Sequence, residues 1–126
     1  MSPGRSRHRR SVAALCCAAV LSVLATAGAA GERFFSAIDD LPVMPALSEV
    51  PDSAMVFSKP EGRIVEVAAT GAVEREAVLA FYRRTLPQLG WRAGAGDGWQ
   101  RDGERLQLTF RTAPRGLLVQ FSLAPR

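Results

Sequence analysis

Two turns near the C-terminus constrain the fold of this chain more than any other feature. Asp102-Gly103 is a strong signal for a two-residue hairpin turn, and residues 113–116 form a second turn that contains Pro and Gly. Counting outward from these turns predicts apolar pairs on one face: Trp99 with Leu106, Leu106 with Leu123, Leu108 with Phe121, and Phe110 with Val119. The pairs on the other face are polar: Thr109 with Gln120, and Gln107 with Ser122. A slip of one residue would mix the two faces, so residues 99–123 predict a three-stranded antiparallel meander in this register.

Residues 73–90 predict a single amphipathic helix that covers the apolar face of the meander. Apolar residues recur there at intervals of three and four: Val78, Leu79, Tyr82, Leu86 and Leu89, with Phe81 widening the stripe. Pro87 would cost about 3 kcal/mol inside a regular helix, so regular helix should stop near Leu86. Gly90 then ends a last turn that Pro87 opens.

Residues 54–69 predict a further antiparallel hairpin before the helix. Residues 54–57 form a short strand, Pro60 and Gly62 supply turn chemistry, and residues 63–69 form a strand that is β-branched at its centre. The expected fold of residues 53–126 is therefore α+β: a single helix on one face of an antiparallel sheet, in the order β-β-α-β-β-β.

Residues 31–52 predict an extended, proline-rich arm before that domain. Pro42, Pro45 and Pro51 prevent a long helix, but the segment is too apolar for a solvated linker. Two alternatives remain open: the arm straps across the core of its own domain, or it docks onto another protein. In the second case the candidate contacts are Phe34, Phe35, Leu41, Met44 and Leu47.

Residues 1–30 have the layout of a secretory signal peptide. Basic residues near Arg5 to Arg10 precede an apolar run over residues 11–25, and small residues continue through Ala30. Cleavage is expected near 29/30 or 30/31, which predicts a periplasmic protein. The alternative is an uncleaved membrane anchor, and only then do we expect a membrane as a partner.

The remaining chain excludes several classes of function. Residues 31–126 carry 12 basic and 12 acidic side chains, so they lack the positive surface that nucleic acid requires. Cys16, Cys17 and His8 all lie in the first thirty residues. The domain therefore has no thiol nucleophile, imidazole base or soft metal ligand.

No other residue pattern predicts catalysis, a cofactor or a metal. The glycine-rich residues 94–98 precede a strand, whereas a phosphate loop precedes a helix. Ser58 and Lys59 are adjacent in a turn, and the carboxylates Asp97 and Asp102 flank turns. We therefore expect a protein that is not an enzyme and needs no cofactor.

Two stretches carry a resemblance. Residues 34–45, together with Val56-Phe-Ser-Lys-Pro-Glu-Gly-Arg-Ile-Val65, resemble uncharacterised small exported proteins of Gram-negative bacteria. The stretch from Val78 to Trp91 is similar to a packing pattern of many bacterial envelope domains. Neither resemblance implies an activity or a catalytic residue.

These features predict a non-catalytic periplasmic interaction or accessory module of the cell envelope, with an envelope protein as its partner. The alternative is a small binding protein for a lipid or other apolar ligand held between helix and sheet. Its candidate wall is aromatic: Tyr82, Trp91 and Trp99.

Overall fold

The C-terminal meander has the predicted register in the computed structural model, which describes residue 4 and residues 32–126. Strands β5 (Gly98–Arg101), β6 (Glu104–Ala113) and β7 (Gly116–Pro125) pair in sequence order. Each predicted pair is observed, from Trp99 opposite Leu106 to Phe110 opposite Val119. The expected signal peptide, residues 1–30, lies outside the described residues apart from Gly4.

The described fold is α+β and mostly sheet. The seven strands of one antiparallel sheet have the order β1-β3-β7-β6-β5-β4, and β2 also pairs with β3. The remaining strands are β1 (Ser48–Glu49), β2 (Met55–Lys59), β3 (Gly62–Gly71) and β4 (Arg92–Ala93). The predicted order lacked β1 and β4, because a two-residue strand has no periodicity to detect in a sequence.

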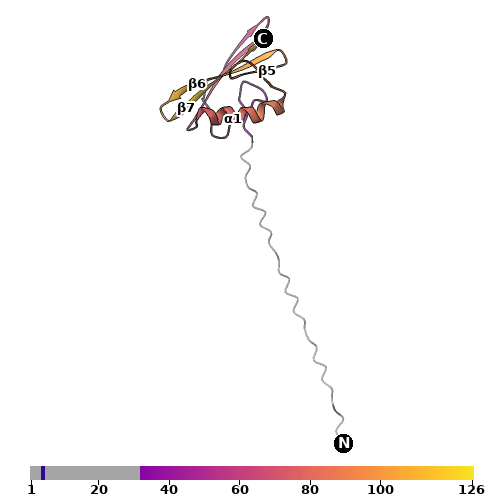
Figure 1. Cartoon of the computed structure of the whole chain (residues 1–126), viewed down its shortest axis with the longest axis vertical. Helices are drawn as coiled ribbons and strands as arrows, with labels where there is room; N and C mark the ends of the chain where they lie inside the picture. The colour runs from indigo at the N-terminus through magenta and orange to yellow at the C-terminus, as the bar shows by residue number, and fades with distance from the viewer. Residues whose placement is uncertain (1–3, 5–31) are drawn as a thin grey trace.

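The one α-helix of residues 32–126, α1 (Arg75–Thr85), lies across one face of the sheet (Figure 1). A 3₁₀ turn, η1 (Leu86–Leu89), follows it and holds Pro87 in its first positions. Gly90 ends this turn in a left-handed conformation with φ of 88°. This geometry confirms the helix end that Pro87 and Gly90 predict.

Residues 32–47 are not an extended arm but a closed loop that packs on the same face. The Phe35 N–H donates to the Leu41 carbonyl over 3.0 Å, and the Val43 N–H donates to the Arg33 carbonyl over 2.7 Å. A bridge between Phe34 and Pro42 closes the loop. The segment that contains Pro42 and Pro45 is therefore folded back on itself and held by its own backbone hydrogen bonds.

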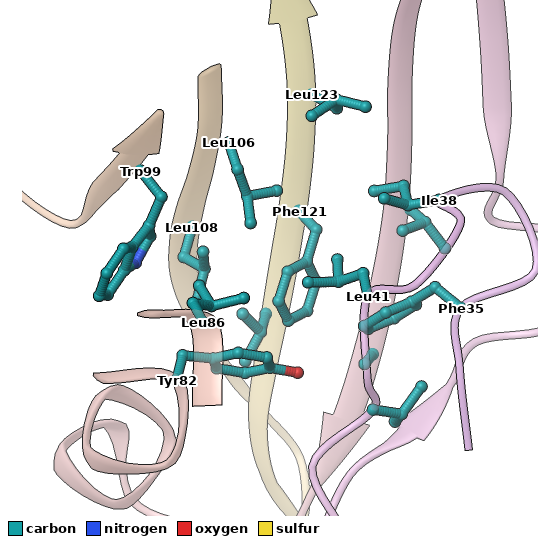
Figure 2. Packing of buried hydrophobic residues seen from close by; sticks show 14 of the residues in the cluster. Phe35, Ile38, Leu41, Tyr82, Leu86, Trp99, Leu106, Leu108, Phe121 and Leu123 are labelled. Carbon is teal, nitrogen blue, oxygen red and sulfur yellow. The ribbon is translucent and has the colours of Figure 1, made fainter. Parts of the chain in front are cut away.

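The core lies between the sheet and a cover made jointly by α1 and this loop. Phe35 packs its ring against Phe121 of β7 with centroids 4.6 Å apart, and Tyr82 of α1 contacts Phe121 at 5.5 Å. Figure 2 shows Phe35 and Leu41 on one side of Phe121, with Tyr82 near its ring. One helix is too narrow to cover the sheet, so the loop supplies the second half of the apolar layer.

Candidate interaction surface

Strands β1 and β2 together form one interrupted edge of the sheet. Both pair with β3, β1 near its end and β2 near its start. Between the two strands, Ser53 forms the hydrogen bonds that a continuous strand would form. Its hydroxyl accepts a hydrogen bond from the Ala68 N–H over 3.1 Å and donates one to the Val50 carbonyl over 2.7 Å. The Val50 N–H donates to the Ala68 carbonyl over 2.8 Å. The interruption is therefore a hydrogen-bonded bulge that resets the edge before β2 begins.

Alternate residues of β2 direct their backbone groups away from β3. The N–H and C=O of Ala68 point toward the β1–β2 edge. The direction of the backbone N–H and C=O groups alternates along a strand, so those of Glu66 and Ile64 also point toward β2. They form hydrogen bonds with the backbone groups of Met55 and Phe57, the residues opposite them. The N–H and C=O groups of Val56 and Ser58 consequently face outward, and no strand within residues 32–126 pairs with them.

The side chains of this edge are apolar and exposed on both faces. Met55, Val56 and Phe57 expose 49%, 57% and 48% of their surfaces. Met55 and Phe57 share a face with Glu66 and Ile64, the face opposite α1, whereas Val56 is opposite the buried Val65 on the helix side. A strand that is apolar on both faces is normally covered on both, and nothing within residues 32–126 covers either face of β2.

The exposure follows from the lengths of the neighbouring strands. β7 pairs with β3 only from Val65 onward, and β2 pairs with residues 62–66 of β3. The part of the β2–β3 hairpin from Phe57 to Ile64 thus extends past β7. A hairpin with an apolar surface and no cover is a candidate for binding another chain.

An open hollow of about 310 Å³ lies beside the beginning of β2. It is lined by residues of the bulge, by Ala54 and by the carboxylates Glu49 and Asp52. Glu49 also accepts hydrogen bonds from the hydroxyl and N–H of Ser36, at 2.6 and 3.2 Å. The hollow is acidic and continues the exposed edge, so it suits a cationic side chain.

The five partner contacts that the sequence predicts lie elsewhere, and most of them are core residues. Phe35, Leu41 and Leu47 are at most 4% exposed, so this prediction is corrected for the three of them: the folded loop buries them against its own sheet. Met44 is half-buried against the same cluster. Phe34 alone is exposed, and it points away from the core that Phe35 fills.

The predicted aromatic wall is also part of the core. Tyr82, Trp91 and Trp99 are all buried. The cavity beside Tyr82 and Trp99 measures about 150 Å³, below the roughly 300 Å³ at which small-molecule sites begin. Trp91 does not line this cavity; the guanidinium of Arg101 stacks over its ring at 4.4 Å. Tyr82 and Trp99 thus share a cavity that is too small for a ligand site, and Trp91 lies outside it.

Polar contacts hold Tyr82 and Arg101 in place. The Tyr82 hydroxyl donates to the Pro42 carbonyl over 2.9 Å, and burial raises the pKa of this phenol far above its ordinary value. Arg101 forms a bidentate ion pair with Asp40: Nη1 and Nη2 each donate to one carboxylate oxygen over 3.0 Å. This hydrogen bonding raises the pKa of Arg101. Both side chains fasten the loop, the first to α1 and the second to β5.

Chemistry-bearing clusters are absent from the described part of the chain. No group of three or more His, Cys, Asp or Glu side chains within residues 32–126 could hold a metal ion. No helix in that range is long and apolar enough to cross a membrane. Asp97 and Asp102, the carboxylates that flank turns, lie at opposite ends of β5, and Asp97 pairs with Arg75 of α1.

One signal in the sequence could have identified β2 as the exposed surface. Met55, Val56 and Phe57 are consecutive apolar residues, so they cannot all face one layer. The predicted architecture contained a cover for only one face of the sheet. A strand with apolar side chains on both faces, in a sheet that is covered on one face only, must expose some of them, and this identifies β2.

Comparison of the chain with protein-family models, with curated proteins and with solved structures gives no match in any of the three.

Proposed function

We propose that this chain is an exported, non-catalytic interaction module of the cell envelope, and that its contact surface is the edge strand β2. The observation that carries the proposal is found on β2: outward-facing backbone groups that no strand of residues 32–126 pairs with, together with three exposed apolar side chains. Partner strands bind such edges by adding to the sheet: backbone hydrogen bonds supply affinity, and flanking side chains supply specificity.

Export is the second part of the proposal. It rests on the basic start, apolar run and small-residue end of residues 1–30. The intact mass of the protein from the periplasmic fraction tests it. We expect a mass that begins at residue 30 or 31. A mass that includes residue 1, from the membrane fraction, would instead show a retained anchor.

Site-specific photo-crosslinking in the native envelope tests the contact surface. A photoreactive phenylalanine at position 57 replaces an exposed side chain of β2, and the same group at Thr109 is the matched control on the outer face of β6, which β3 and β7 separate from β2. We expect protein adducts from position 57 and none from position 109. Adducts from Thr109 alone, or from neither position, would contradict the proposal.

A further inference from the structure

We propose that the chain which binds β2 is a second copy of this protein. Two β2 strands would pair antiparallel about a two-fold axis that passes through Val56, joining two sheets into one. This inference rests on the proposed function, since it names the partner of the same surface. Two-fold symmetry is the commonest symmetry of soluble homo-oligomers.

The backbone of β2 is compatible with this axis. Val56 and Ser58 direct their N–H and C=O groups to the free edge, as the pairing with β3 requires. A two-fold axis at Val56 places it opposite itself in a hydrogen-bonded pair. Ser58 then lies opposite Ala54 of the second copy, and both outward-facing residues have partners.

The side chains of β2 match themselves in this register. Met55 lies opposite Phe57 of the second copy, and Phe57 lies opposite Met55 of the second copy. Val56 meets Val56 of the second copy on the other face. Shifting the axis by one residue, to Phe57, would instead set Val56 opposite Ser58 and Met55 opposite Lys59, so apolar side chains would face polar ones.

The dimer also buries apolar surface beside β2. Ile64 lies directly opposite Phe57 on β3 and is half-buried in one copy. The two-fold axis brings Met55, Phe57 and Ile64 from both copies onto one face, where each set extends the other. Burial of these side chains is the driving force that we expect for association.

The expected dimer is weak. Two strands of five residues each form a small contact, below the roughly 1,200 Å² at which standard protein interfaces begin. The dissociation constant should lie within the micromolar to millimolar range, and the monomer must be stable by itself. Both properties make the association measurable without unfolding the protein.

Sedimentation velocity of the purified protein over that concentration range tests the inference. We expect a concentration-dependent dimer for the wild type. Val56→Lys would place two like charges opposite each other on the axis and should raise the dissociation constant at least about tenfold. Thr109→Lys adds the same charge on β6, which β3 and β7 separate from β2, and should leave the dimer unchanged.

A mixture of two variants tests the two-fold axis itself. Val56→Lys and Val56→Glu should each be monomeric alone, because like charges meet at the axis. Mixed in equal amounts they should form a heterodimer, because opposite charges then meet. Thermal melting of each dilute variant checks that its monomer is folded.

Three results would overturn the inference. They are a wild-type protein that stays monomeric at millimolar concentration, a Val56→Lys variant that still dimerises, and a mixture that does not associate. If the wild type is monomeric while position 57 crosslinks to a different protein, this inference fails and the proposed function stands. If position 57 also gives no adduct, the proposed function fails with it.

Discussion

The loop of residues 32–47 and strand β2 are both short, apolar segments; the loop contains Pro42 and Pro45, and Pro51 and Pro60 lie on the two sides of β2. One segment is buried and the other is exposed. The loop buries Phe35, Leu41 and Leu47 against the sheet, whereas β2 leaves Met55, Val56 and Phe57 exposed. The difference lies in the polar groups that surround them. Tyr82 and Arg101 hold the loop on the core, and no part of the described chain reaches across β2. Apolar composition alone therefore does not distinguish a segment that packs on its own core from one that is exposed to a partner.

The largest effect that can break this comparison comes from a matched pair of substitutions. Phe35→Ala removes a ring that is 4% exposed, and it should lower the free energy of unfolding by about 3–5 kcal/mol. Phe57→Ala removes a ring that is 48% exposed, and it should change that free energy by about 0.5 kcal/mol or less. Urea unfolding of dilute protein measures both. Equal losses would mean that β2 is as much part of the core as the loop.

A pH titration of Tyr82, the only tyrosine, tests the hydrogen bond that attaches the loop to α1. Burial raises the pKa of Tyr82, so below pH about 10 both folded and unfolded states keep the phenol proton. Above that pH the unfolded state loses the proton first, and stability should fall as pH rises. Tyrosinate absorbance should therefore appear only as the protein unfolds. Its appearance near pH 10 in a folded protein would contradict the buried hydrogen bond to Pro42.

Tyr82→Phe is the companion variant. It removes the hydroxyl but keeps the ring that packs on Phe121. The free energy of unfolding at neutral pH should fall by about 0.5–1.5 kcal/mol, because the Pro42 carbonyl loses its donor. The alkaline fall that tyrosine ionisation causes should disappear. A variant that retains the same alkaline fall would assign it to another group.

The smallest effect concerns the ion pair that ties the loop to β5. Asp40→Asn weakens the contact with Arg101 but keeps its shape. The carboxylate of Asp40 is half exposed, so the loss should be only about 0.2–1 kcal/mol and should shrink with added salt. Asp39→Asn changes the neighbouring exposed carboxylate and is the control. A loss that salt does not reduce would exclude an electrostatic cause.

Turn chemistry explains how much of this fold the sequence predicts. Asp102-Gly103 and residues 113–116 determine the register of three strands, and Pro87 with Gly90 determines where the helix stops. These are local constraints, which one stretch of chain carries by itself. The α+β class and the covered face follow from them.

The remaining features depend on contacts between distant segments. The loop is held on the core by the Tyr82 hydroxyl, which donates to the Pro42 carbonyl, 40 positions earlier in the chain. Ser53 forms the bulge through Ala68, 15 positions later. No local pattern announces either contact, so the sequence could not decide between an arm on its own core and an arm on a partner. By contrast, the three consecutive apolar residues Met55, Val56 and Phe57 mark the exposed surface of β2 in the sequence itself.

Amide hydrogen exchange measured at low and high protein concentration tests the contrast between loop and edge most directly. The Phe35 and Val43 amides, which donate within the loop, should exchange slowly at every concentration. The outward-facing Val56 and Ser58 amides should exchange fast in dilute protein and slow down as its concentration rises. Rapid exchange at Phe35, or exchange at Val56 that does not depend on concentration, would contradict a loop that belongs to the core and an edge that binds a second copy.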